Sequence, residues 1–459
     1  MAVAPRTIDI ATFIDERKLG PFNYKLILLS WLITVFDGFD MMMISFTAPY
    51  MRDEMGLDKL QLGNVFSAGM LGMMIGGFAF AYLGDRLGRR RTIISAAFAF
   101  GILTTATAFA GTYEHLLILR FLDGVAIGGM LPLAWALNIE YVPNKMRSTV
   151  VTIIMVGYSV GTALAGPVTV WLAPTYGWEG VFLVGGLGTL VCAVALLFAL
   201  PESVRFLASK NIRPELIAKT LNRLDPTLGA TAQDRFVLTD EVKVKGEFTP
   251  AQLFLGDLKW LTPLLWTAYI ASTLAVYFKA NWGPIVYEEL NFSRDTAAYV
   301  SSFGGMMGAV LGLLLMRFTD KKGPFAVAVF PAIAFPFLLL VGLVPMEQTM
   351  FLIVSVFATS FVGGAHFGIL SIAGVFYPSA IRANGAGWAT SIAKIGGIVG
   401  PVVGAYVLAS GLPIVTSYAV LAVCPAILAI CAIGIGVIVR RRRTAAAPAV
   451  PLTAPVPAS

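Results

Sequence analysis

The sequence predicts an all-α membrane protein with 12 transmembrane helices, arranged as two pseudo-symmetric six-helix bundles. The first reason is composition. Of 459 residues, 57% are hydrophobic and only 13% are charged, whereas a soluble protein of this length needs far more polar surface. The second reason is a series of apolar runs, each long enough to cross about 30 Å of hydrocarbon. The third is an internal repeat that divides the chain near its middle.

Twelve apolar runs recur along the chain. They favour helices over a β-barrel, because barrel strands are much shorter. A helix also satisfies its own backbone in lipid and tolerates Gly and Pro when it packs on its neighbours. The expected spans are residues 24–50, 62–83, 92–111, 115–140, 149–173, 179–200, 261–287, 297–318, 325–344, 349–376, 384–408 and 412–439.

Short motifs return at a nearly constant offset in the second half. DRLG at 85–88 returns as DKKG at 320–323, and Arg147 returns as Arg382. Parallel halves of this kind are typical of transporters, whose substrate site lies between the halves near the midplane. The expected parts are an amphipathic cytoplasmic segment at the membrane surface (1–23), the first bundle (24–200), a cytoplasmic linker (201–260), the second bundle (261–439) and a disordered cytoplasmic tail (440–459).

The positive charges indicate the orientation in the membrane. With the N-terminus in the cytoplasm, 27 of the 33 Lys and Arg residues fall on the cytoplasmic side, three on the other side and three within spans. The positive-inside rule then places both termini in the cytoplasm, as in a multi-pass inner-membrane protein. A basic surface facing anionic lipid accounts for the net charge of +7. We therefore expect a lipid bilayer and no nucleic acid as partners, and a monomer.

The sequence offers no framework for a metal or a cofactor. Cys192, Cys424 and Cys431 all fall within apolar runs, where we expect them as small core residues. The two histidines belong to no cluster with metal-ligand spacing, and no phosphate-binding loop is present in the sequence. We expect no cofactor, no metal and no enzymatic activity.

Charged residues inside the spans are the candidate functional groups, because each costs roughly 2.5–3.5 kcal/mol at the bilayer centre. Asp37 and Asp40 lie three residues apart and project from one face of a helix. Two neighbouring carboxylates in a low dielectric do not both ionise readily, so the pair is suited to hold a proton near neutral pH. The alternative is that they only pair with a basic residue and hold helices together.

Arg120 and Asp123 repeat the same spacing in the fourth span. Arg120 could bind a substrate carboxylate, or it could be the fixed partner of Asp123 or of the aspartates of the first span. In either case its loss would leave a buried charge uncompensated. We group Asp123 with Asp37 and Asp40 as proton-coupling candidates.

The second half carries its own intramembrane cations. Lys279 and Lys394 lie within spans, and a buried ammonium needs an anion, which a carboxylate substrate would supply. Snorkelling or structural pairing is the alternative. His366 could relay protons, since an imidazole changes charge near neutral pH, or it could be a hydrogen-bonded core residue. The candidate substrate contacts are Arg120, Lys279, Asn281, Trp282, His366 and Lys394.

The segment GDRLGRRRT at 84–92 forms a tight basic turn on the predicted cytoplasmic side. Gly88 permits a close bend, and Asp85 can accept from a neighbouring helix N-terminus or an arginine. We expect this contact to hold the outward-open state and to break on inward opening. The alternative is a plain positive-inside loop.

Further charged residues are expected in the same cytoplasmic layer. Glu140, together with Arg147, is expected to belong to the cytoplasmic gate, and the alternative is a simple charge at a helix end. Glu202 with Arg205 in PESVR could clamp the same layer. The second-half repeat of the basic turn should act in the same way. The candidate gating residues are Asp85, Arg86, Gly88, Arg89, Arg90, Glu140, Arg147, Glu202, Arg205, Asp320 and Arg382.

These motifs carry a family resemblance. YLGDRLGRRRT resembles the loop signature of the major facilitator superfamily, and PESVRFL resembles the Pro-Glu-Ser motif of several branches. FDGFDMMMISFTAPYM, LRFLDGVAIGGMLP and YPSAIRANGAGWATSIAKIGG are similar to the aromatic acid:proton symporter family, and the likeness extends over roughly residues 8–410. The resemblance implies the major facilitator fold, uptake of a benzoate-like carboxylate with protons by alternating access, and a requirement for Asp37 and Asp40.

Some positions depart from the family pattern. Ala81 replaces the usual first Gly of the loop signature, and Lys394 stands where relatives often carry Arg. Lys279 and His366 occupy places where neutral residues are expected, so a dicarboxylate or a pyridine carboxylate remains an alternative cargo.

Other classes of protein fit the sequence less well. A drug:proton antiporter would have a more regular glycine spacing in helix 5. A sugar porter would have a Pro-Glu motif after the last helix, where VIVRRRRTAAAPAV stands instead. A receptor or a scaffold would need a larger soluble module than residues 201–260.

Overall fold

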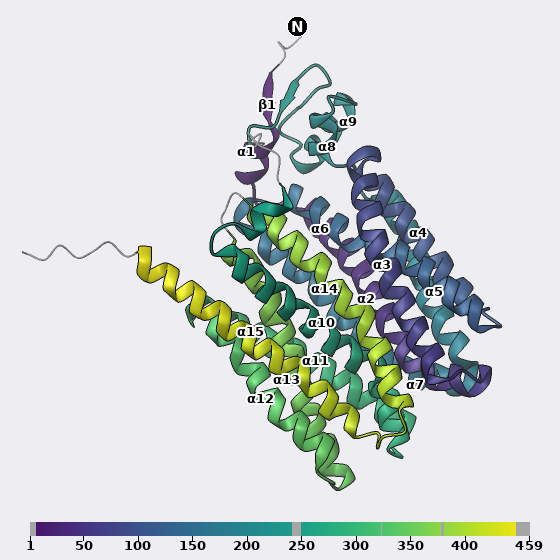
Figure 1. Ribbon diagram of the computed structural model, residues 1–459. Helices are drawn as coiled ribbons and strands as arrows, with labels where there is room; N and C mark the ends of the chain where they lie inside the picture. Colours follow the sequence, from purple (N-terminus) through teal and green to yellow (C-terminus); the bar gives the residue numbers. More distant parts are fainter. Residues whose placement is uncertain (1–5, 241–248, 323, 378–380, 447–459) are drawn as a thin grey trace, which may run out of the picture.

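Long helices dominate the computed structural model, which describes residues 6–240, 249–322, 324–377 and 381–446 (Figure 1). The first half contains α2 (Pro21–Met55), α3 (Lys59–Leu87), α4 (Arg89–Thr107), α5 (Tyr113–Gly128), α6 (Met130–Glu140) and α7 (Arg147–Ala199). The second half contains α10 (Leu258–Glu289), α11 (Arg294–Lys322), α12 (Pro324–Leu343), α13 (Gln348–Phe376), α14 (Arg382–Ala409) and α15 (Thr416–Ala446).

These helices account for the 12 predicted spans. Ten segments are long and apolar enough to cross a membrane, with α5 and α6 forming one of them. The segment that contains α7 covers two predicted spans, because Gly177, at φ 67° and ψ −179°, breaks the helix between them. The remaining span is α4, whose 19 residues begin with three arginines, Arg89 to Arg91. The predicted all-α membrane fold is confirmed.

Local sequence explains where the first two long helices begin and end. Pro21 occupies the first turn of α2, where its missing N–H costs nothing, and α2 ends at Gly56 in the left-handed conformation with φ 65°. Asp58 then caps α3 by accepting from the Gln61 N–H at 2.7 Å, while Gln61 Oε1 accepts from the Asp58 N–H at 3.0 Å. This reciprocal capping box satisfies two backbone donors that would otherwise be free.

Small elements cover one end of the bundle. They are β1 (Thr7–Asp9), α1 (Ile10–Asp15), α8 (Val204–Ser209), α9 (Pro214–Leu224), β2 (Arg235–Val237) and the 3₁₀ turns η1 (Asn144–Met146) and η2 (Pro250–Phe254). β1 pairs in parallel with β2, with Thr7 opposite Arg235. The N-terminal segment is thereby attached to the linker by a pairing that the sequence analysis did not predict.

The last helix is longer than predicted. α15 continues to Ala446, so residues 440–446, expected in the disordered tail, are helical. Arginine is a good helix former, and the run of arginines simply extends the apolar helix that precedes it. The rest of the expected tail, 447–459, lies outside the described residues.

Close helix contacts build the first half. A Cβ on Gly161 of α7 would lie 1.9 Å from the Val35 carbonyl oxygen of α2, and a Cβ on Gly38 would lie 2.2 Å from the Tyr158 carbonyl oxygen. Only glycine allows two backbones to approach this closely. The contact holds α2 against α7 over the stretch that contains Asp37.

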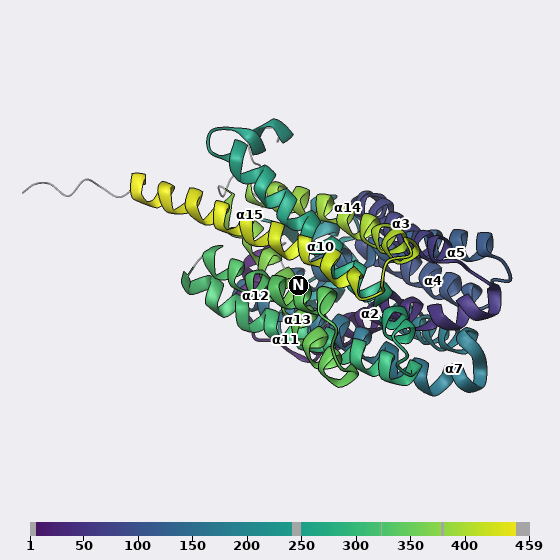
Figure 2. The ribbon, with the colours of Figure 1, turned by 60° about the horizontal axis from the view of Figure 1, so that its bottom comes forward.

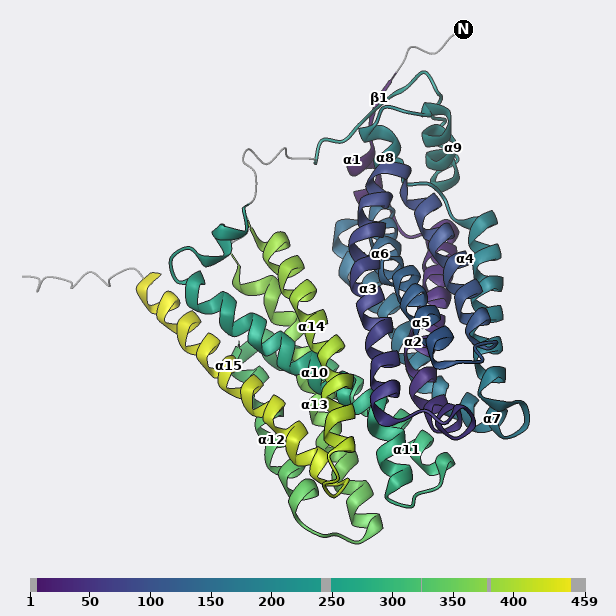
Figure 3. The same ribbon diagram turned by 45° about the vertical axis from the view of Figure 1, so that its right-hand side comes forward.

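The two halves form adjacent groups of helices, coloured purple to blue and green to yellow (Figure 2). They meet at one end and diverge toward the other (Figure 3). We call the end that carries β1, α1, α8 and α9 the linker end, and the opposite one the far end. We call the structure open at the linker end because the two halves diverge there.

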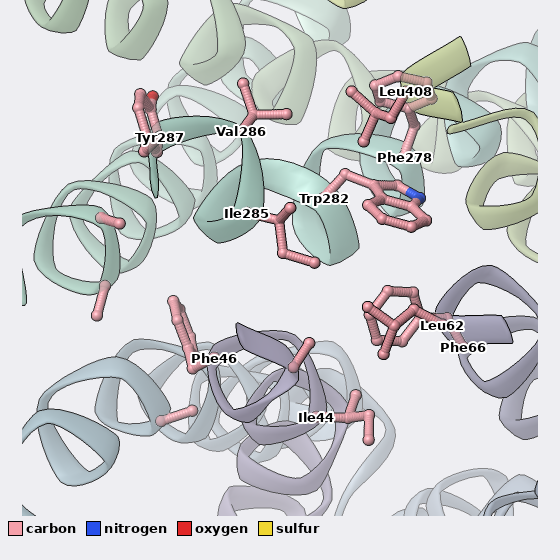
Figure 4. Close-up of a cluster of buried hydrophobic side chains, with 14 of the residues drawn as sticks. Ile44, Phe46, Leu62, Phe66, Phe278, Trp282, Ile285, Val286, Tyr287 and Leu408 are labelled. Atoms are coloured by element: carbon pink, nitrogen blue, oxygen red, sulfur yellow. The ribbon is translucent and has the colours of Figure 1, made fainter. Parts of the chain in front are cut away.

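A layer of apolar side chains joins the halves toward the far end (Figure 4). Phe66 of α3 packs edge-on against Trp282 of α10, with ring centroids 5.5 Å apart. At the rim, Arg52 lies 3.3 Å from Glu288, and Lys59 lies 2.9 Å from Glu289. The far end is therefore closed by an apolar layer with ion pairs outside it.

Candidate functional site: a cavity between the halves

A central cavity of about 380 Å³ lies between the two halves. Its walls come from α2, α3, α5, α6 and α7 of the first half and from α10, α11, α13 and α14 of the second half. Most of the lining is apolar, and the charged or imidazole side chains in it are Asp37, Lys279, His366 and Lys394. A cavity of this size and character suits a small, mostly apolar ligand with one charged group.

Asp37 is the acidic residue of the cavity wall. Its side chain is only 1% exposed, and neither carboxylate oxygen has a hydrogen-bond partner among the described residues. Tyr158 of α7 and Tyr277 of α10 also line the cavity, one from each half. A buried carboxyl group without a partner is costly as an anion, so this position favours a proton or a bound cation.

Asp40 lies on a different face of α2, in a polar cluster behind the cavity. Its two oxygens accept from Nη1 and Nη2 of Arg120 at 3.0 and 2.8 Å. Arg120 Nη1 also donates to Asp123 at 2.7 Å, and Thr104 Oγ1 donates to Asp123 at 3.1 Å. Asp40, Arg120 and Asp123 are all buried. We call these three residues the charged triad.

The charged triad separates residues that the sequence grouped together. Asp40 and Asp123 were predicted to act with Asp37, but the structure pairs both with Arg120. Arg120 was predicted to contact substrate, and it does not line the central cavity. The alternative in which Arg120 is a fixed partner of the carboxylates therefore describes this structure. The bidentate geometry with Asp40 is the strong form of such a pair.

Two ammonium groups face the cavity from the second half. Lys279 has no hydrogen bond or ion pair in the part of the chain that the structure describes. Lys394 Nζ donates to the Met73 carbonyl oxygen of α3 at 3.3 Å. His366 also lines the cavity, with Nδ1 2.9 Å from Ser272 Oγ, which agrees with the hydrogen-bonded alternative for this histidine. An anion entering the cavity would meet these lysines.

Asn281 and Trp282 do not reach the cavity, contrary to the predicted substrate contact. Asn281 accepts from Ser45 Oγ of α2 at 2.9 Å, and Trp282 Nε1 donates to the Pro401 carbonyl oxygen at 2.9 Å. Each residue turns a helix by about 100°, so Asn281, two residues after Lys279, projects from nearly the opposite side of α10. Trp282 shares a side of the helix with Lys279, but its bond to Pro401 holds it against α14. They help to close the far end instead.

A second polar cluster ties the basic turn to the linker end of the first half. Glu140 is buried and accepts from Arg89 of α4 and from the Ser203 hydroxyl. Glu202 accepts from the backbone N–H of Arg90 and of Ser203, both at 3.0 Å. Gly88 has φ 96°, and a Cβ there would lie 2.6 Å from Glu202 Oε2. The turn therefore requires glycine.

Two of the predicted gate pairs are not formed. Arg147 donates to the Val142 carbonyl oxygen at 3.4 Å instead of pairing with Glu140. Arg205 pairs with Asp240 at 2.5 Å, while Glu202 is occupied by backbone donors. The reason is that η1 separates Arg147 from the end of α6, and that Arg205 lies on α8, where it faces the strand of the linker.

The remaining gate candidates lie at the open end. Asp85 is exposed and has no hydrogen bond or ion pair within the described ranges, so its gating role stays a prediction. The guanidinium of Arg86 lies 4.5 Å from the ring centroid of Tyr82. Arg90 Nε donates to the Leu200 carbonyl oxygen at 2.7 Å. The side chains of Asp320 and Arg382 lie outside the described residues.

Two residues that lie beside the buried carboxylates could not be found from the sequence. Tyr158 carries no signal in the sequence, because only the packing of α2 against α7 brings it beside Asp37. Thr104 was likewise invisible, since it meets Asp123 through a contact between α4 and α5. The charged residues of the site could be found from the sequence, because each of them interrupts an apolar run.

Comparisons with known proteins agree with this architecture. The sequence pattern of the Major Facilitator Superfamily matches residues 30–401. A 4-hydroxybenzoate transporter of Pseudomonas aeruginosa is 34% identical over 412 residues, which cover 89% of this chain and 91% of the relative. A gallate transporter of Pseudomonas putida is 33% identical over 407 residues and 88% and 90% of the two chains.

Two further comparisons extend this picture. A benzoate transport protein of Acinetobacter baylyi is 28% identical over 434 residues, which cover 93% of this chain and 92% of the relative. Among solved structures, an inward-open xylose transporter of E. coli matches with a TM-score of 0.71 and 18% identity, covering 89% of this chain and 95% of that one. At that identity the match concerns the fold alone.

Proposed function

Because the chain belongs to the major facilitator superfamily, and within it to the aromatic acid:proton symporter family, we propose that it imports an aromatic carboxylate with protons by alternating access. It is a multi-pass membrane transporter and not an enzyme. Relatives that cover most of the chain are named as transporters of 4-hydroxybenzoate, gallate and benzoate. Each of these cargoes is a single-ring carboxylate, which suits the volume and the apolar lining of the central cavity.

One observation carries the coupling part of the proposal: Asp37 shares the cavity with Lys279 and Lys394. The ammonium groups attract a substrate carboxylate, while an ionised Asp37 in the same low-dielectric space repels it. A proton on Asp37 removes that repulsion, so proton and substrate favour each other's binding. By linkage the effect is reciprocal.

Alternating access follows from the contacts between the halves. In the state described here, the apolar layer and the ion pairs close the far end. Opening that end requires these contacts to part while the linker end closes. The predominance of Lys and Arg on the linker-end connections supports a cytoplasmic location for this end. On this proposal the structure faces inward, both termini are cytoplasmic, and the protein acts as a monomer in the inner membrane.

A second class of cargo has specific support. Two lysines line the cavity, so a second carboxylate could also be neutralised there, as in a dicarboxylate. A pyridine carboxylate is a further candidate, since a niacin transporter of Acinetobacter baylyi is 26% identical over 403 residues. Competition between cargoes separates these possibilities.

The test is uptake of labelled 4-hydroxybenzoate into proteoliposomes with an acidic exterior. We expect accumulation of up to about tenfold per unit of pH gradient for one proton per substrate, because one unit is worth about 1.4 kcal/mol. A protonophore should abolish it. Benzoate should compete better than nicotinate or succinate. Uptake that ignores both the gradient and the protonophore, or that xylose inhibits but benzoate does not, would overturn the proposal.

A further inference from the structure

A second pocket, of about 420 Å³, lies at the linker end, on the outside of the first half. It is formed by the α3–α4 turn, the end of α7, the segment that leads into α8, and α9. Figures 1 and 3 both place α8 and α9 beside the ends of α3 and α4. None of its lining residues lines the central cavity. We call it the basic pocket.

The basic pocket has a large excess of positive charge. Its cationic residues are Arg86, Arg90, Arg91, Arg213, Lys219 and Arg223, against one acidic residue, Glu202. Glu202 already accepts from two backbone N–H groups. All of the cations except Arg90 are exposed, and in the described part of the chain these exposed cations form no ion pair. Such an unbalanced cluster around a concave site attracts a polyvalent or phosphate-type anion.

Exposed apolar side chains adjoin the pocket. They favour an anion that belongs to an amphipathic molecule. Phe198, near the end of α7, is 84% exposed, and Leu87, at the end of α3, is 53% exposed. Both residues line the pocket, and both stand at the ends of membrane-spanning helices. An occupant with acyl chains could cover these side chains while its head group meets the arginines.

The helix α9 is amphipathic, with an apolar side and a basic side. Its buried residues, among them Ile217 and Leu221, pack on the first half, while Lys219 and Arg223 are exposed on its other side. A short helix of this kind beside the ends of spanning helices is suited to the interface between membrane and water. The positive face of α9 is then directed at the pocket rather than at a protein partner.

We propose that the basic pocket binds the phosphate head group of an anionic phospholipid from the leaflet at the linker end. The phosphodiester is held by arginines and by Lys219, and the acyl chains lie along Leu87 and Phe198. The inference is independent of the transported substrate. Because all of the walls belong to the first half and the linker, the lipid would fasten α9 to the bundle without touching the path between the halves.

The experiment uses the full-length protein in a non-ionic detergent at low salt. Binding of dioctanoyl phosphatidylglycerol, dioctanoyl phosphatidylcholine and glycerol phosphate is measured by native mass spectrometry and by titration of thermal stability. The pocket variant combines Arg91→Gln, Lys219→Gln and Arg223→Gln. The control variant combines Lys25→Gln, Lys145→Gln and Arg235→Gln, which remove the same charge from exposed positions outside the pocket.

We expect phosphatidylglycerol to bind the wild type. The affinity of the pocket variant for this lipid should be lower on the order of 100-fold, because each basic residue near an anionic lipid contributes about 1 kcal/mol. The affinity of the control variant for phosphatidylglycerol should differ from that of the wild type by about threefold or less. A variant that keeps the charge, with Arg91→Lys and Arg223→Lys and with Lys219 unchanged, should preserve most of the binding. A monodisperse size-exclusion profile and a melting temperature in lipid-free detergent that matches the wild type show that each variant is folded.

Three results would overturn the proposal. Equal losses in the pocket and control variants would show that only the general positive charge of this side matters. Phosphatidylcholine that binds as tightly as phosphatidylglycerol would remove the role of the anionic head group. Glycerol phosphate that binds as tightly as the lipid would make the pocket a site for a soluble phosphate compound.

Discussion

Asp37 and Asp40 lie one turn apart on α2, yet their surroundings differ. Asp37 faces the central cavity with no hydrogen-bond partner among the described residues. Asp40 forms two hydrogen bonds with Arg120 inside the charged triad. The sequence marks both aspartates as charges inside an apolar span. It could not divide the two roles, because the division depends on where α5 places Arg120.

The first prediction contrasts these two aspartates. Asp37→Asn should leave the melting temperature in detergent unchanged or raised, because it removes an unpaired buried charge. Asp40→Ala should destabilise the protein by about 3–5 kcal/mol, since Arg120 loses its bidentate partner inside the bundle. Thermal unfolding of the two purified variants measures the difference. A larger loss for Asp37→Asn than for Asp40→Ala would contradict the assignment.

The lysines of the cavity lead to the second prediction. Lys279→Met and Lys394→Met should each raise the KM for 4-hydroxybenzoate uptake by about 10- to 100-fold, because a hydrogen bond to a charged group contributes about 1.5–3 kcal/mol. Lys394→Met should also weaken the contact with Met73 of the other half. The exposed Lys145→Met is the control. An unchanged KM in both cavity variants would exclude these lysines from substrate binding.

At the scale of elements, glycine contacts decide how closely α2 and α7 pack. The third prediction is that Gly161→Ala lowers both the folded yield and transport, with a cost of about 1–3 kcal/mol, because its Cβ would meet the Val35 carbonyl oxygen. Gly387→Ala is the matched control, since that helical glycine has open space around it. Size-exclusion profiles and uptake rates check both variants. Equal behaviour of the two would contradict the packing argument.

The attachment of the N-terminal segment has its own electrostatic signature. Burial disfavours the charge on Asp9, but hydrogen bonds from Thr12 and Thr239 outweigh it and lower the pKa of Asp9 to about 2. The ordinary value for an aspartate is about 3.9. A carboxyl whose pKa is lowered by folding stabilises the folded form at all pH values above the unfolded pKa. That contribution is lost as the pH falls through the folded pKa.

The fourth prediction follows from that sign. Hydrogen-exchange protection of β1 and α1 should be constant from pH 7 down to about pH 4 and should fall between about pH 4 and pH 2. Asp9→Asn should weaken the protection at neutral pH and remove this dependence, because the Thr239 contacts lose their anionic acceptor. Protection in the wild type that already falls between pH 7 and pH 5 would show that another group controls the attachment.

Much of the element order could be predicted from the sequence, because apolar runs of membrane length are local features. The exceptions have physical causes. Gly177 turns the chain so tightly that two predicted spans follow each other without a loop. The pairing of β1 with β2 joins Thr7 to Arg235, and contacts so distant in sequence leave no periodic signal in strands of three residues.

At the scale of the whole molecule, the internal repeat predicted two halves with a site between them. It could not predict which end is open, because a rigid-body movement of one half against the other leaves the repeated motifs within each half in place. The state is defined by contacts between the halves, such as Lys59 with Glu289 and Ser45 with Asn281. Asn281 and Trp282 were wrongly predicted as substrate contacts, because counting along α10 does not reveal which of its faces meets α2 and α3.

The central claim is that the proton which accompanies the substrate is carried at Asp37. The most direct measurement is the pH inside proteoliposomes, with no imposed gradient, after 4-hydroxybenzoate is added outside. The account predicts that the wild type acidifies the lumen beyond control liposomes. The Asp37→Asn variant should exchange labelled for unlabelled substrate without moving protons. Substrate-dependent acidification by Asp37→Asn that equals the wild type would contradict the account.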